Sequence, residues 1–65
     1  KHGNGIVIGY TVLYEGTKPT LGVFYIEDSQ GERKVVTSED KAVITSMREE
    51  EWIEKEISFY GNQVS

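Results

Sequence analysis

Residues 6–14 read Ile-Val-Ile-Gly-Tyr-Thr-Val-Leu-Tyr, and this stretch decides the fold of the 65-residue chain. β-Branched and aromatic residues dominate it, and such a composition predicts a long β-strand. Apolar residues occupy both alternating sets of positions, so we expect the strand to be buried along part of each face. Gly9 in its interior predicts a bulge or bend, the feature that lets a strand curl around a small barrel.

Two more strands are predicted directly after this one. Residues 15–19, Glu-Gly-Thr-Lys-Pro, predict a loop, because Gly permits positive φ and Pro cannot join a central ladder. The second strand is predicted at about residues 20–28 and the third at about residues 32–36. Residues 28–31 begin with Asp and end with Gly, which is typical of a type I turn, so these two strands should form a hairpin.

A short amphipathic helix is predicted at about residues 38–49. Residues 37–40, Thr-Ser-Glu-Asp, fit a capping box in which Asp replaces the more usual Glu or Gln. A helix this short needs a surface to dock on, so we expect Val43, Ile44 and Met47 to bury against the sheet.

The chain is then predicted to return to the core at Trp52 and Ile53. A last strand is predicted at about residues 56–60, with Ile57 and Phe59 pointing inward.

The predicted order is strand, strand, strand, helix, strand, which indicates a mostly β or α+β domain. Long curved first strands and a helix before the last strand are typical of the OB fold, but a complete barrel of that kind needs a fifth strand. We therefore predict a small, partly open, OB-like antiparallel barrel over residues 6–60. Residues 1–5 are predicted to be a linker and residues 61–65 a frayed tail.

Charge, hydropathy and chain length limit the classes of function that we expect. With 11 acidic and 7 basic residues and a net charge of −4, the chain is poorly suited to binding nucleic acid. No apolar run approaches the ~18 residues that span a bilayer, so we expect a cytoplasmic protein with no membrane partner. A domain of ~60 residues buries only ~60% of its unfolded surface. The chain also starts at Lys1-His2 without an initiator Met, so we expect a module of a longer protein.

The sequence predicts no catalytic residue and no metal ligand set. There is no cysteine, and the single histidine, His2, falls in the predicted linker. Glu27 and Asp28, and the three glutamates at 49–51, are interpreted as a solvated acidic surface, because carboxylate chemistry needs two such groups flanking a deep cleft. Nothing in the sequence specifies a cofactor for this domain or an oligomeric state.

The aromatic residues allow two interpretations. On an OB-like face, exposed rings can stack nucleic acid bases, although such platforms normally come with basic grooves. We favour the alternative that the rings fill the small core. Arg33-Lys34 is the only adjacent basic pair, on a strand whose exposed edge charged side chains also protect. The rings belong to Tyr10, Tyr14, Phe24, Tyr25, Trp52, Phe59 and Tyr60.

A family resemblance adds to this picture. Gly5-Ile6-Val7, Tyr10-Thr11-Val12 and Tyr14 resemble the opening G-x-V-x-x-Y-T-V of the additional C-terminal domain of the thiolase-like protein type 1 group. The similarity covers residues 5–60, and Tyr10-Thr11-Val12 and Gly31-x-Arg33 are its most specific parts. The chain departs from the pattern at Glu54, where we expect a glycine. The remaining matches are Pro19, Gly22-Val23, Glu32, Thr37, Asp40 and Glu51-Trp52-Ile53.

The resemblance implies an OB-like module joined to the C-terminus of a thiolase-fold, acetyl-CoA acetyltransferase-like parent. It implies that thioester chemistry and the CoA thioester belong to the parent, because no residue of the parent active site maps onto this chain. The domain would be a non-catalytic accessory domain that packs on the parent and shapes access to its acyl-CoA site. The alternatives are an OB-type oligonucleotide-binding module and a protein-interaction module that uses an exposed strand edge.

Overall fold

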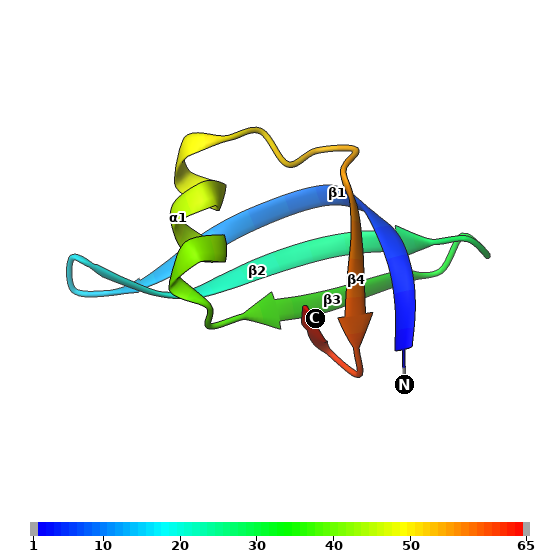
Figure 1. Cartoon of the computed structure of the whole chain (residues 1–65), viewed down its shortest axis with the longest axis horizontal. Coiled ribbons are helices and arrows are strands. Elements are labelled where there is room, and N and C mark those ends of the chain that lie inside the picture. Colours follow the sequence, from blue (N-terminus) through cyan, green and yellow to red (C-terminus); the bar gives the residue numbers. More distant parts are fainter. Residues whose placement is uncertain (1, 65) are drawn as a thin grey trace.

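Strand β1 (His2–Glu15) organises the barrel because it is the longest strand, pairing with one neighbour along residues 2–6 and with another along residues 5–15. The computed structural model describes residues 2–64. Within them the strands close an OB-like barrel in the order β1-β2-β3-β5-β4, with β4 returning to β1 (Figure 1). All pairings are antiparallel except that of β3 with β5. The other elements are β2 (Lys18–Asp28), β3 (Arg33–Ser38), α1 (Lys41–Glu49), β4 (Glu56–Tyr60) and β5 (Gln63–Val64).

The bulge predicted at Gly9 is confirmed, and it explains why both faces of β1 carry apolar residues. The register with β2 shifts between Val7 and Gly9. Before the shift Val7 is buried in the core; after it, Tyr10 and Val12 are the residues packed against the core. The inward positions therefore change from odd to even numbers, and Ile8 is left on the outside.

The prediction of a linker over residues 1–5 is wrong for residues 2–5, and Lys1 lies outside the described residues. His2 to Gly5 belong to β1 and pair with β4. Glycines suggested a loop, but here they allow close packing. An added Cβ would come within 2.6 Å of the Phe59 ring at Gly3, and within 2.7 Å of Ile26 Cδ1 at Gly5.

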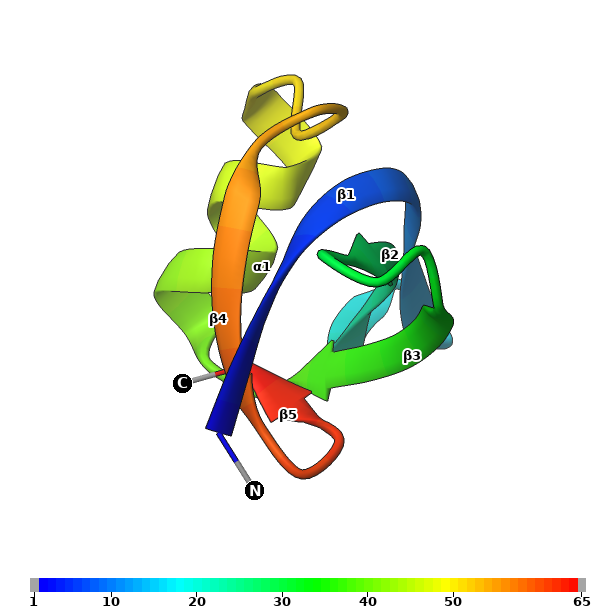
Figure 2. The ribbon, with the colours of Figure 1, turned by 90° about the vertical axis from the view of Figure 1, so that its right-hand side faces the viewer.

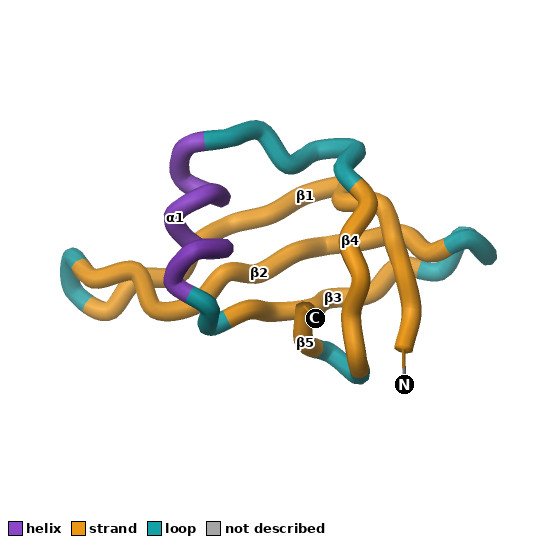
Figure 3. The backbone as a smooth tube through the Cα atoms, viewed as in Figure 1, coloured by secondary structure: helices purple, strands orange, loops and turns teal. Residues whose placement is uncertain are grey.

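The hairpin of β2 and β3 is confirmed. The Gly31 N–H donates to the Asp28 carbonyl at 3.0 Å, and Gly31 has φ 83°. The preceding loop is shorter than predicted, because Lys18 already pairs with Glu15. Pro19 lies near the start of β2, a place where a strand tolerates proline. The hairpin of β1 and β2 extends past α1, away from the rest of the barrel (Figure 3).

Helix α1 begins at Lys41, later than predicted, because Ser38 still belongs to β3. The capping residue is Asp40, whose carboxylate accepts from the Ala42 N–H at 2.8 Å and the Val43 N–H at 3.4 Å. Ile44 and Met47 are buried, as predicted, and Val43 is partly buried against the core. The end at Glu49 is confirmed.

A fifth strand, which the sequence did not reveal, closes the barrel. Residues 61–65 were predicted to fray, but Gln63 and Val64 form β5 beside the end of β3, and Ser65 lies outside the described residues (Figure 2). The predicted last strand matches β4, with Ile57 and Phe59 buried. Trp52 packs on the core, whereas Ile53 is 41% exposed, so its predicted return to the core is wrong. The buried core cluster is Val7, Phe24, Ile26, Val36, Met47, Ile57 and Phe59.

Candidate binding surface

A groove crosses the outer face of β1, β2 and β3. We call it the outer groove; its volume is about 440 Å³. It is open to solvent and lies on the opposite side of the sheet from the core. The residues that line it are Ile8, Gly9, Tyr25, Arg33, Lys34 and Val35.

Strand register brings these residues together. Gly9 pairs with Tyr25, which pairs with Val35, so the three form one row across the sheet. The bulge adds Ile8 to this row by turning it outward. A Cβ on Gly9 would lie 3.6 Å from Tyr25 Cδ2, so the ring lies close beside the glycine.

The apolar side chains of the outer groove are open to water. Ile8 is 40% exposed, Tyr25 44% and Val35 51%. Single exposed apolar residues are common on proteins, whereas contiguous exposed apolar patches are where binding sites are found most often. The outer groove is therefore the best candidate for a binding surface on this domain.

Neither Arg33 nor Lys34 forms an ion pair with a carboxylate among residues 2–64. Within residues 2–64 the one ion pair joins Lys55 to Glu50, so the Arg33 guanidinium has none, although Glu27 is its cross-strand neighbour. Glu27 instead lines a separate hollow together with Glu56. Lys34 Nζ lies 5.5 Å from the centre of the Phe59 ring, toward the open end of the barrel.

The other residues considered from sequence have structural roles. His2 is exposed, with its ring centre 5.6 Å from that of Tyr60. The Asp28 carboxylate accepts from the backbone of Gln30 and Glu32, both at 2.9 Å. Across residues 2–64, no group of three or more His, Asp or Glu side chains is placed to hold a metal ion.

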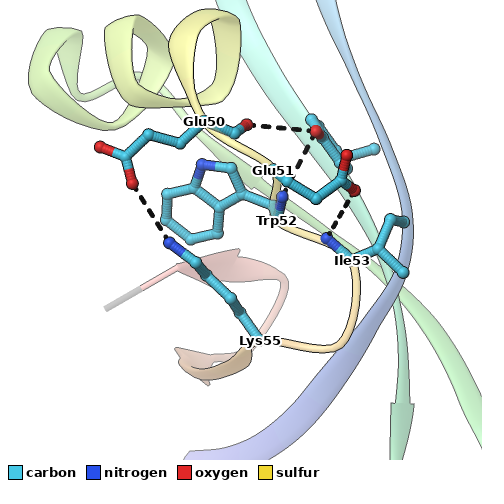
Figure 4. Close-up of polar contacts among 6 residues, drawn as sticks. Glu50, Glu51, Trp52, Ile53 and Lys55 are labelled. Atoms are coloured by element: carbon cyan, nitrogen blue, oxygen red, sulfur yellow. Dashed lines mark hydrogen bonds and ion pairs between the residues drawn. The ribbon is translucent and has the colours of Figure 1, made fainter.

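The glutamates at 49–51 do not form a site either. Glu50 pairs with Lys55 at 3.3 Å, and Glu51 accepts from the Ile53 N–H at 3.1 Å (Figure 4). Lys55 Nζ also lies 4.9 Å from the centre of the Trp52 ring. These contacts hold the connection between α1 and β4 in place.

The expectation that the aromatic rings fill the core is only partly right. Phe24 and Phe59 are buried, and Tyr10 and Trp52 pack on the core. The other three tyrosines are exposed: Tyr14, Tyr25 and Tyr60. Sequence reasoning also missed Ile8 and Val35 as surface residues, because their placement depends on the bulge and on the register.

Comparison of the chain with protein-family models, with curated proteins and with solved structures finds no match. Within residues 2–64, no helix is both long enough and apolar enough to cross a bilayer.

Proposed function

We propose that this chain is a non-catalytic accessory domain that packs through the outer groove on a thiolase-like, acetyl-CoA acetyltransferase-like parent and shapes access to its acyl-CoA site. The observation that carries the proposal is the exposed apolar row of Ile8, Tyr25 and Val35. Covering this row removes apolar area from water, which is the main driving force of protein association.

The link to a thiolase-like parent rests on the resemblance over residues 5–60. One structural observation supports it. The pattern expects a glycine at position 54, and Glu54 has φ 75°, the one positive value at a non-glycine residue within 2–64. Left-handed backbone favours glycine, so the local structure suits the residue that the pattern expects.

The chemistry of such a protein would belong to the parent. Thiolase-type acyl transfer needs a thiolate nucleophile, and this chain has no cysteine. In this proposal the domain contributes a surface, and the CoA thioester is the parent's ligand.

Reading the gene upstream of residue 1 tests the parent. We expect a thiolase-like region in the same reading frame; a stop codon followed by a separate start directly before this domain would refute it. Docking is then tested by titrating the separately produced parent region with this domain. Tyr25→Ser should weaken binding about tenfold or more, as central aromatic anchors do. Tyr60→Ser is the matched control, since Tyr60 is 63% exposed and lies on β4; equal losses from both variants would contradict docking through the groove.

An OB-type oligonucleotide-binding module is the second candidate. The exposed Tyr25 ring near Arg33, which makes no ion pair with any of residues 2–64, favours it, because bases stack on aromatic and guanidinium planes. Anisotropy of labelled single-stranded DNA and RNA at low salt tests it. Saturable, salt-sensitive binding that Tyr25→Ala abolishes would support this candidate, and absence of binding would reject it.

A further inference from the structure

The first half of β3 has a free edge. The Asp28 N–H donates to the Glu32 carbonyl at 2.8 Å, so Asp28 and Glu32 form a hydrogen-bonded pair. Such pairs alternate along an antiparallel ladder, so Arg33 and Val35 direct their N–H and C=O groups away from β2. Thr37 confirms this alternation, because its N–H also points away from β2 and donates to the Asn62 carbonyl at 2.9 Å.

Strand β5 reaches β3 only at Thr37, which pairs with Gln63. No backbone partner occupies the edge at Arg33 and Val35 within residues 2–64. An unpaired edge of this kind is a template for another strand.

The free edge and the outer groove are continuous, because Arg33 and Val35 belong to both. Residues that pair across two strands point their side chains to the same face. A strand added at this edge would thus place every second side chain over the outer groove, next to Arg33 or Val35.

The charge here differs from that of the rest of the chain. The chain carries a net charge of −4, yet Arg33 directs its positive charge to the outer groove, whereas Lys34 turns its Nζ to the Phe59 ring on the other face of the sheet. Arg33 makes no ion pair within residues 2–64. This edge therefore favours an acidic segment and disfavours both a basic one and a second copy's cationic edge.

We propose that the free edge of β3 takes up an extended segment of the partner protein as an added strand. The segment carries an apolar side chain beside Val35 and a carboxylate beside Arg33, two residues apart. Because β5 blocks the edge at Thr37, pairing is short, and the groove side chains supply much of the specificity. The inference rests on the proposed docking function and specifies the chemistry of the docked segment.

Titration of the whole chain with peptides capped at both ends tests the inference. Binding is followed by NMR of the chain's backbone amides. The probe Ser-Glu-Thr-Val-Thr-Glu-Ser has a glutamate two residues from valine in either direction. We expect saturable shifts and slowed hydrogen exchange at the Arg33 and Val35 amides. The same peptide N-methylated at the valine and the second glutamate keeps its side chains but loses two donors, and should bind at least about tenfold more weakly.

Charge exchange provides the second arm. The probe with lysines in place of the glutamates should bind at least about tenfold more weakly to the native chain. Arg33→Glu should reverse this preference. Arg48→Glu makes the same charge change on α1 and should leave it unaltered.

Three results would overturn the inference: equal binding of the N-methylated peptide, shifts confined to residues outside β3, or no binding of the glutamate peptide. Protection of the Arg33 and Val35 amides that rises with protein concentration alone would also overturn it, because a second copy would then occupy the edge. The proposed function is judged separately. If the parent region binds and the Arg33 and Val35 amides still exchange freely, docking is supported and strand addition is refuted. If the peptide binds as expected and the parent region does not, strand addition is supported and docking on that parent is refuted.

Discussion

The Tyr10 hydroxyl accepts a hydrogen bond from the Trp52 backbone N–H at 3.3 Å and donates one to the Glu50 carbonyl at 3.2 Å. It thereby ties β1, just after the bulge, to the connection between α1 and β4. The Trp52 indole packs on Phe24, with ring centres 5.0 Å apart. One phenol oxygen thus satisfies a backbone donor and a backbone acceptor.

Tyr10→Phe should lower the free energy of unfolding by about 1–2 kcal/mol, because the Trp52 N–H loses its partner while the ring packing is kept. Urea denaturation measures this change. Tyr60→Phe removes a hydroxyl from an exposed ring and should change stability by less than about 0.5 kcal/mol. Equal effects of the two substitutions would show that the Tyr10 hydroxyl has no structural role.

Gly22→Ala should destabilise the domain by about 1–3 kcal/mol, because an added Cβ overlaps the Met47 sulfur and this buried side chain must shift out of its packed position. Gly9→Ala is the matched control in the neighbouring strand, where the nearest atom to an added Cβ is 3.6 Å away. It should change stability by less than about 0.5 kcal/mol. Thermal unfolding of both variants measures the difference, and similar melting points would contradict the close packing of α1 on β2.

Met47→Ala should cost about 2–5 kcal/mol, because Met47 is only 5% exposed and leaves a cavity between α1 and the sheet. Thr45→Ala, at an exposed position of α1, is the control. The Met47→Ala background should also reduce the cost of Gly22→Ala, because the overlapping sulfur is gone. A loss below about 0.5 kcal/mol for Met47→Ala, or strict additivity of the pair in denaturant melts, would mean that this face of α1 is not packed as described.

Glu54→Gly should stabilise the domain by about 0.5–1 kcal/mol. A left-handed conformation costs a residue with a Cβ roughly 1–2 kcal/mol, and the greater chain entropy of glycine in the unfolded state offsets part of that gain. Glu51→Gly nearby, at a residue without a positive φ, should instead destabilise the domain or leave it unchanged. Chemical denaturation of both variants decides, and destabilisation by Glu54→Gly would refute the expected relief of strain.

Local sequence patterns correctly predicted the strands and turns that are determined by their own residues. The bounds of β4 follow from the alternation of Ile57 and Phe59, and the turn at residues 28–31 from its Asp and Gly. The start of β1 and the whole of β5 were missed, because their pairing comes from distant strands. Gly3 resembles a loop residue until its strand partner is known, and Gly61 does lie in a turn, the one that leads into β5. The helix start was predicted too early because Thr37 and Ser38, which suit a cap, are used by β3.

The candidate surface could be predicted only in part. The third strand was predicted from its composition. Tyr25 and Arg33 were considered for base stacking, but the favoured interpretations placed the aromatic rings in the core and used Arg33-Lys34 to protect a strand edge. The row of Ile8, Tyr25 and Val35 depends on a one-residue change of phase in β1 and on the pairing of three strands. Neither the position of the bulge in β1 nor the register of the three strands follows from the periodicity of one sequence, because a one-residue slip moves every side chain to the opposite face.

The closing strand β5 is only two residues long, and it pairs with β3 at Thr37 alone. If β5 detached together with Asn62, whose carbonyl accepts from the Thr37 N–H, that N–H would be released and the free edge of β3 would gain one donor. An incoming strand and β5 would then be rivals for that donor, and each would weaken the other's hold by the same factor. Detachment of β5 from β3 and binding of an added strand would thus be thermodynamically linked. The stability of this short pairing would then set how many residues of β3 an added strand can pair with.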